Sequence, residues 1–127
     1  MDIKKLSGLK WYQLTLGPGA GLHASLRDFL EKERLSKAFV LTCIGSCSRV
    51  VAVYPKTYDI PPELGRVEFE GLFEINSIAG DVTRENESIR VHLHGSLTKE
   101  GREVFGGAIQ EGTTIFKMAD LVIAGLG

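Results

Sequence analysis

Two stretches of the sequence decide the fold: Val67-Glu-Phe-Glu-Gly-Leu-Phe-Glu-Ile-Asn76 and Ser88-Ile-Arg-Val-His-Leu-His-Gly-Ser-Leu97. In both, apolar residues occupy most odd positions and polar residues most even ones. Because successive side chains of a strand point to opposite faces, this period of two predicts two strands, each with one face in the core. His92 and His94 then share the polar face of the second strand.

The flanking segments predict one helix and further strands. Residues 11–16 alternate and end in the turn-forming glycines and proline of residues 17–21. Apolar residues then recur at the spacing of one helix face from Leu22 to near Leu35. Apolar runs predict strands at 39–44 and 49–54, separated by a break or bulge at Gly45-Ser46, and a last strand at 114–124. Residues 80–87 predict a strand end followed by a polar hairpin loop.

The length and these elements predict a single domain over residues 1–127. The predicted class is α+β, with an antiparallel-dominated sheet of about seven strands and one main packed helix. Residues 38–44 and 121–123 are apolar at both odd and even positions. A strand tolerates this pattern only when both of its faces are covered. A second copy of the chain is the simplest cover, because obligate interfaces resemble a domain core cut in half. The pattern predicts self-association without choosing between a dimer and a trimer.

Composition limits the cellular compartments and the kinds of binding partner that we expect. The formal net charge of -1 gives no overall positive field for nucleic acid. No secretory apolar region and no stretch long enough to span a membrane occurs. Cys43 and Cys47 would lie about 13 Å apart on one extended strand, beyond the reach of a disulfide. We therefore expect a soluble cytoplasmic protein with reduced core thiols and no membrane partner.

Several motifs in the second half of the chain carry a family resemblance. Gly71-Leu-Phe-Glu-Ile-Asn76, Ile78-Ala-Gly80 and Val91-His-Leu-His-Gly-Ser-Leu97 are followed by Gly106-Gly-Ala108. They resemble, in order and spacing, the Gly-Arg-Phe-Glu-Ile-Leu, Leu-x-Gly, His-Leu-His and Gly-Gly-His motifs of the plants and prokaryotes conserved (PPC) domain family. The resemblance spans about residues 9 to 124. Its matching motif positions include Gly71, Phe73, Glu74, Ile75, Gly80, Gly106 and Gly107.

The resemblance implies an antiparallel-dominated sheet with a packed helix, assembled as a homotrimer. In plants the PPC domain follows AT-hook peptides and serves in nuclear protein interaction and transcriptional regulation, whereas prokaryotic members are often the bare domain. This chain has no Arg-Gly-Arg-Pro core to read the minor groove, so the DNA binding of the AT-hook is not carried over. The expected partners are further copies of the chain and another protein.

His92 and His94 suggest a metal site. At i and i+2 on a strand they project side by side about 7 Å apart, so their imidazoles could chelate one ion, with zinc the candidate. The third histidine of the resembled Gly-Gly-His motif is replaced by Ala108, and His23 could approach only through folding or across a subunit boundary. The alternatives are hydrogen bonds to neighbouring carboxylates, Glu74 among them, and a pH-sensing role.

Other polar features predict no catalytic residue. Glu68, Glu70 and Glu74 could be acid–base carboxylates, but a solvated or interfacial strand face balanced by Arg90 accounts for them. The glycine-rich residues 17–21 precede a helix but lack the Gly-Lys-Ser/Thr end of a phosphate loop. Lys4, Lys5 and Lys10 make a weak basic patch near Trp11 and Tyr12. Buried strand cysteines are usually inert.

The functional expectation is therefore a non-catalytic, homotrimeric, PPC-like interaction and regulatory module, associated with DNA through a partner. The alternative is a zinc-dependent small-molecule binding protein or enzyme that uses His92 and His94.

Overall fold

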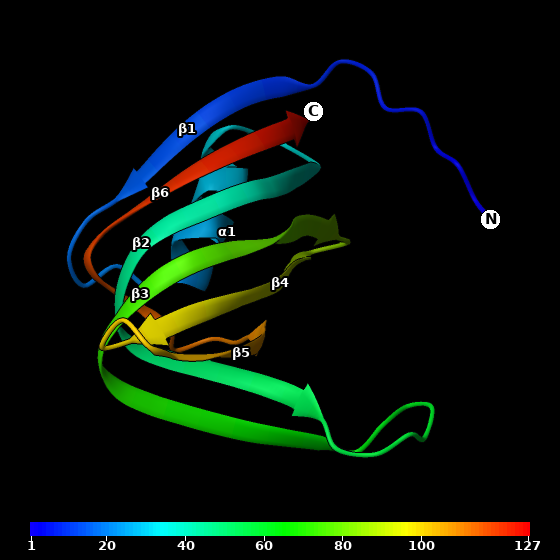
Figure 1. Ribbon diagram of the computed structural model, residues 1–127. Helices are drawn as coiled ribbons and strands as arrows, with labels where there is room; N and C mark the ends of the chain where they lie inside the picture. Colours follow the sequence, from blue (N-terminus) through cyan, green and yellow to red (C-terminus); the bar gives the residue numbers. More distant parts are fainter.

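The computed structural model describes residues 1–127 and places one helix against a six-stranded antiparallel sheet (Figure 1). The strand order is β1-β6-β2-β3-β4-β5, and a short stretch of β5 also pairs with β2. The predicted fold class is confirmed. The elements are β1 (Lys10–Leu16), α1 (Leu22–Lys32), β2 (Lys37–Pro55), β3 (Leu64–Glu85), β4 (Ser88–Lys99), β5 (Glu103–Ile109) and β6 (Thr114–Leu126).

The two strands predicted on either side of Gly45-Ser46 form one continuous strand, β2. The chain bends at Gly45 without leaving the sheet, and the register with β6 shifts between Gly45 and Cys47. Gly45 has φ +147°, and a Cβ there would overlap the carbonyl oxygen of Met118 on β6. Of the two predicted alternatives, a break or a bulge, the structure therefore shows the irregularity of a bulge, and glycine allows the close approach of β6 there.

The strand end and hairpin predicted for residues 80–87 are present, but the loop is shorter than expected. β3 continues to Glu85, and the turn is confined to Asn86 and Glu87. Residues 81–83 are polar in part, yet they pair with β2 on one side and with β4 on the other. Backbone pairing on both sides holds a segment whose composition alone favoured a loop.

No strand is predicted from the sequence at residues 103–109, because glycine pairs such as Gly106-Gly107 are typical of turns. In the structure β5 pairs with β4 along its whole length, and Ile109 and Ala108 also pair with Ala52 and Val53 of β2. The sheet therefore curls, so that its last strand lies beside the far half of β2.

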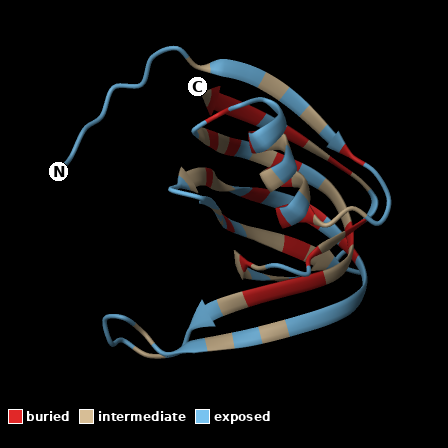
Figure 2. Ribbon diagram, turned by 180° about the vertical axis from the view of Figure 1, so that it is seen from behind, coloured by how far each residue is buried: buried red, intermediate tan, exposed pale blue.

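The core lies between α1 and the face of the sheet that it covers. Leu22, Leu26 and Leu30 are fully buried on one side of the helix (Figure 2). The helix ends at Lys32, earlier than predicted, and Arg34 takes the left-handed φ of +55° in the turn that follows. The 11 residues of α1 are too few to cross a bilayer. The single helix covers one face of the sheet. The opposite face, which we call the outer face, is not covered by any helix of this chain.

Two segments project from the body on the same side (Figures 1 and 2). One is the N-terminal arm, residues 1–8, all of which are exposed. The other is the far end of the β2–β3 hairpin, whose connecting loop carries the fully exposed side chains of Tyr58 and Ile60.

Candidate functional site

His92 and His94 project together from the outer face of β4. Their Nε2 atoms lie 3.2 Å apart, within hydrogen-bonding distance, and their rings meet edge to face with centroids 5.0 Å apart. Leu93, between them, is buried in the core on the opposite face. The shared polar face predicted from the alternation of β4 is therefore confirmed, and the imidazole nitrogens lie much closer than a strand repeat of about 7 Å, because the side chains lean toward each other.

The neighbours of this histidine pair come from β3 and β5. Asp81 lies opposite His92 on β3, and Ala108 lies opposite His94 on β5. The hydrogen bond expected between the histidines and Glu74 is absent, because Glu74 lies further along β3, opposite Thr98. The imidazoles hydrogen-bond to each other instead.

The pair fits two positions of a metal site. Two imidazole nitrogens at adjacent corners of a zinc tetrahedron are separated by about 3.3 Å, close to the separation here. No cluster of three or more histidine, cysteine, aspartate or glutamate side chains forms anywhere in the chain. The residues present therefore do not complete a closed tetrahedral zinc site, and Ala108 stands where the PPC motif would add a donor.

His23 is excluded as the missing ligand. It belongs to the first turn of α1, its side chain is 5% exposed, and its Nε2 lies 3.1 Å from the carbonyl oxygen of Ile109. It therefore sits on the helix side of the sheet, whereas His92 and His94 project from the outer face. Burial also removes it from the reach of a neighbouring copy.

Burial determines the charge state of His23. Desolvation lowers the pKa of its imidazole, against the opposing effects of nearby Glu111 and of the Ile109 hydrogen bond. Glu111 forms a bidentate ion pair with Arg27, in which the two guanidinium nitrogens lie 2.7 and 3.0 Å from the two carboxylate oxygens. The hydrogen bond from Arg27 is the main reason that the pKa of Glu111 is lowered. Nδ1 of His23 is buried without a partner, an arrangement suited to a neutral imidazole.

The outer face carries a second feature, which we call the outer apolar patch. It consists of large apolar side chains on four strands that are neighbours in the sheet, and each is between 40% and 65% exposed. This is the face that the apolar runs at 38–44 and 121–123 predicted to need cover. Its members are Trp11, Leu41, Ile44, Leu72, Phe116 and Val122.

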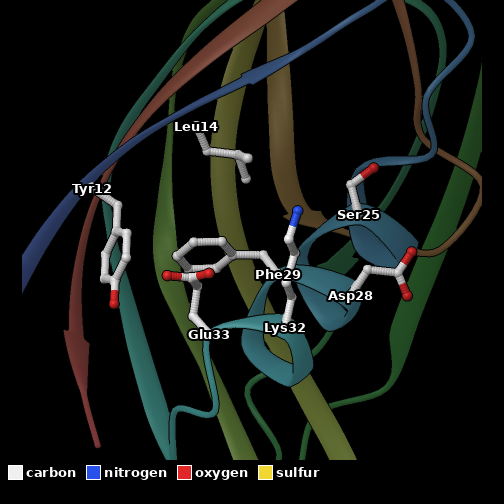
Figure 3. Close-up of a pocket in the computed structure, with 7 residues that line it drawn as sticks. All are labelled: Tyr12, Leu14, Ser25, Asp28, Phe29, Lys32 and Glu33. Atoms are coloured by element: carbon white, nitrogen blue, oxygen red, sulfur yellow. The ribbon is translucent and has the colours of Figure 1, made fainter.

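A groove lies between β1 and α1 (Figure 3). Its volume is about 470 Å³, and Tyr12 and Phe29 meet edge to face in it with ring centroids 5.0 Å apart. The sequence analysis missed this groove because its walls come from two elements whose relative position no local pattern reports. The lining residues are Tyr12, Leu14, Ser25, Asp28, Phe29, Lys32 and Glu33.

Of the three carboxylates considered for acid–base chemistry, Glu68 is a surface ion-pair partner, whereas Glu70 and Glu74 are exposed and form no ion pair. Glu68 lies 3.2 Å from Arg49 and 2.9 Å from Arg66, and the hydrogen bond from Arg66 is the first cause of its lowered pKa. Arg90, the predicted counter-charge, lies 3.9 Å from Glu85 instead. The alternation of β3 did not reveal this, because Arg49 comes from the neighbouring strand.

The remaining sequence candidates also have structural roles. Cys43 and Cys47 are free and buried, as expected, and burial raises the pKa of each thiol to about 12, which leaves both as unreactive thiols. The glycine-rich turn 17–21 leads into α1, and the first helical N–H, that of Leu22, donates to the carbonyl of Thr113. Lys4, Lys5 and Lys10 are exposed at or beside the N-terminal arm.

Comparison with known proteins agrees with the fold. The family model of the Plants and Prokaryotes Conserved (PCC) domain, the PPC family of the motifs above, matches residues 4–127. A PPC protein from Pyrococcus horikoshii has a TM-score of 0.84 at 24% identity, covering 99% of this chain and 85% of that one. A metal-containing protein from Archaeoglobus fulgidus has a TM-score of 0.83 at 26% identity, covering 100% and 87%.

Two further similarities concern other kinds of protein. The bifunctional protein GlmU of a Synechococcus strain is 28% identical over 116 residues, which are 91% of this chain and 17% of that protein. The chain therefore spans under a fifth of the length of this relative. A Bacteroides thetaiotaomicron protein that is provisionally named as DNA-binding has a TM-score of 0.76 over 96% of this chain and 80% of that one, at 16% identity, and so shares the fold alone.

Proposed function

Because this chain belongs to the Plants and Prokaryotes Conserved (PPC) domain family, we propose that it works as a non-catalytic homotrimeric module for protein interaction and regulation. In this proposal three copies cover one another's outer faces. Their loops and the histidine-bearing face of β4 are then presented to another protein, through which any association with DNA arises.

The outer apolar patch carries this proposal. Ile44 and Val122, on adjacent strands, are 53% and 40% exposed, and Leu72 is 63% exposed. Several large apolar side chains exposed on one face of a sheet are typical of an interaction site. The patch lies opposite the face that α1 covers, so nothing in the chain itself can bury it. We infer the number of copies, three, from the PPC resemblance, because the patch alone fits a dimer equally well.

The buried and paired groups considered for catalysis have other roles in the structure. The cysteines are buried with raised pKa values, Glu68 is in surface ion pairs, and His23 is bonded to a backbone carbonyl in the core. An interaction module needs none of these groups to react.

The mass in solution tests the assembly. We expect light scattering coupled to size exclusion to give three times the chain mass of 13.9 kDa, stable over a wide dilution series. A monodisperse particle of a single chain mass at every concentration would contradict the proposal, as would a dimer.

A second candidate function rests on the 3.2 Å separation of the His92 and His94 Nε2 atoms. The pair is preorganised to chelate a metal ion, and a relative from Archaeoglobus fulgidus is metal-containing. In this candidate the two imidazoles hold zinc as two of its ligands, and the remaining positions are open to water or a small molecule. Zinc so bound would act as a Lewis acid.

Elemental analysis separates the two candidates. Protein purified without a histidine tag should carry about one zinc per chain if the pair binds metal, and the double variant His92→Ala, His94→Ala should carry none. Zinc content that is low and equal in the two proteins would exclude the metal candidate and leave the interaction module unaffected.

A further inference from the structure

Strand β1 is an open edge of the sheet. It pairs with β6 on one side and has no strand on the other, so half of its backbone N–H and C=O groups lack a ladder partner. Natural sheets block such edges with proline, inward-pointing charge or a bulge. Beyond Lys10 at its start, β1 contains none of these. The edge is therefore ready to accept another strand.

The groove beside this edge is lined by three apolar residues and by Asp28 and Glu33, which we call its acidic rim (Figure 3). Leu14 and the Tyr12–Phe29 pair form the apolar part. Asp28 and Glu33 line the same groove, and neither is in an ion pair within the chain. Lys32 is the single basic residue of the lining, so the rim favours a strand that brings a further positive charge.

The N-terminal arm has the complementary character. Ile3 is 83% exposed, and the arm leaves the start of β1 and runs away from the body (Figures 1 and 2). Lys4 and Lys5 have no ion-pair partner in the chain. An extended segment of eight residues reaches about 26 Å from the start of β1.

We propose that residues 1–8 of one copy add as a strand to the free edge of β1 in a second copy and cover its groove. The proposal rests on the self-association put forward above. Residues two apart share one face of a strand, so Ile3 lies over Phe29 while Lys5 reaches the carboxylates of Asp28 and Glu33. On the other face, Leu6 lies beside Trp11, which is 65% exposed. Backbone pairing supplies the affinity and the side chains set the register.

The arm of the same chain does not fill the groove. To pair with its own β1 it must reverse direction immediately before Lys10. Gly8 has φ +74°, but the segment before β1 leads away from the body instead of folding back along β1 (Figure 1). A neighbouring copy requires no reversal, since its arm arrives already extended.

Photo-crosslinking between isotopically distinct chains tests the exchange. The full chain carries p-benzoylphenylalanine in place of Ile3, and assemblies are formed from equal parts of light and isotopically heavy protein. We expect crosslinks to the α1 peptide that contains Phe29, joining light to heavy chains. The same photoreactive residue at Tyr58, on the hairpin loop, is the control and should give no crosslink to α1.

The other outcomes overturn the inference. Crosslinks that join only chains of the same isotope would show that the arm folds onto its own β1. Crosslinks elsewhere, or none, would show that the arm does not occupy the groove. The mass measured on the same samples separates the two proposals: a trimer without arm-to-groove crosslinks overturns only this inference, whereas a monomer overturns the proposed function as well.

Charge reversal provides an independent measurement. Lys5→Glu should lower the yield of the interchain crosslink about two- to fivefold, the range of an exposed ion pair. Replacing Asp28 and Glu33 with lysine in the same chain should restore it. Arg102→Glu, at an exposed position in the β4–β5 turn, is the matched control and should leave the yield unchanged. An unchanged yield for Lys5→Glu would contradict the pairing of the arm with the acidic rim.

Discussion

Ala108 lies directly opposite His94 in the antiparallel ladder between β4 and β5. Directly opposed residues of a ladder have Cβ atoms about 5 Å apart on the same face of the sheet. A histidine at position 108 would therefore face the imidazole pair from the neighbouring strand. The methyl group of Ala108 leaves that pair with two nitrogen donors and no third ligand.

Ala108→His should convert the pair into a three-histidine site. We expect zinc and cobalt affinity to rise by at least about tenfold, because loss of even an outer-shell partner costs 10- to 100-fold in known metal sites. Titration with cobalt, followed by its visible absorption, measures the gain. Ala108→Gln, of similar size but without an imidazole, is the control, and an equal gain in both variants would contradict a third ligand at this position.

Gly80→Ala should destabilise the fold strongly. Gly80 has φ +154°, and an added Cβ would overlap the carbonyl oxygen of His92 on β4. Backbone strain and the overlap together should lower the free energy of unfolding by about 2–5 kcal/mol, as measured by chemical denaturation. Gly101→Ala is the control: φ is +72° there and nothing lies within 4 Å, so the loss should be only about 1 kcal/mol. Equal losses would mean that the contact with His92 is unimportant.

Ile44→Lys should dissociate the assembly. The substitution places a charge in the middle of the outer apolar patch, where the proposed trimer would bury it unpaired. We expect the midpoint of dissociation to rise at least about 100-fold in concentration, measured by sedimentation. Ile60→Lys, at a 99% exposed position on the hairpin loop, should leave the mass unchanged. An intact trimer of the Ile44 variant would show that the patch is not the interface.

His23 should make stability depend on pH between about 5 and 7. Burial lowers the pKa of its imidazole in the folded chain below the ordinary value of 6.5. The unfolded chain therefore binds the proton more tightly, so the free energy of unfolding is greatest above pH 6.5 and falls as the pH drops through that value. One proton limits the slope to about 1.4 kcal/mol per pH unit.

The variant His23→Gln isolates this effect. A glutamine amide retains a donor for the Ile109 carbonyl and does not titrate, so the slope between about pH 5 and 7 should shrink. Titration of Glu111 does not contribute to the slope in this pH range. Its pKa is lowered, so it affects stability only at pH values near and below its ordinary pKa of 4.5. Denaturant titrations at several pH values measure the slopes. The same slope in the wild type and in this variant would contradict the role of His23.

The isolated chain should not bind DNA directly. Its net charge is -1 and it has no minor-groove arginine motif. In fluorescence anisotropy with an A·T-rich duplex, we expect no binding at about 200 mM salt and none at about 50 mM, where any phosphate contacts would be far stronger. Binding at low salt that weakens steeply with added salt would reveal a basic surface and contradict a purely partner-mediated association.

Some parts of the fold were predictable because the information is local. The alternation of residues 88–97 fixed which side chains of β4 face the core, and it placed His92 and His94 together on the other side. The spacing of Leu22, Leu26 and Leu30 likewise fixed the buried side of α1. A strand or helix repeat is set by backbone geometry within a few residues, so a pattern in the sequence reports it directly.

The features that could not be predicted from the sequence all depend on contacts between residues that are distant in the chain. The polar composition of residues 80–87 predicts an early strand end and a long loop, but pairing of residues 81–83 with β2 and of residues 81–85 with β4 extends the strand to Glu85. Arg49 rather than Arg90 pairs with Glu68, because the register of β2 and β3 decides which charges meet. The groove beside Phe29 exists only because α1 crosses the sheet next to β1.

Local sequence patterns are sufficient to predict the faces of the strands, the single helix, the apolar excess on the outer face and the family motifs. The contact between the two imidazoles, the burial of His23 on the other side of the sheet, and the open edge of β1 beside an acidic groove all depend on the tertiary fold. The reason is physical: a side chain's direction follows from its own backbone, whereas its neighbours follow from strand order and register, which are set by pairing between residues far apart in the chain.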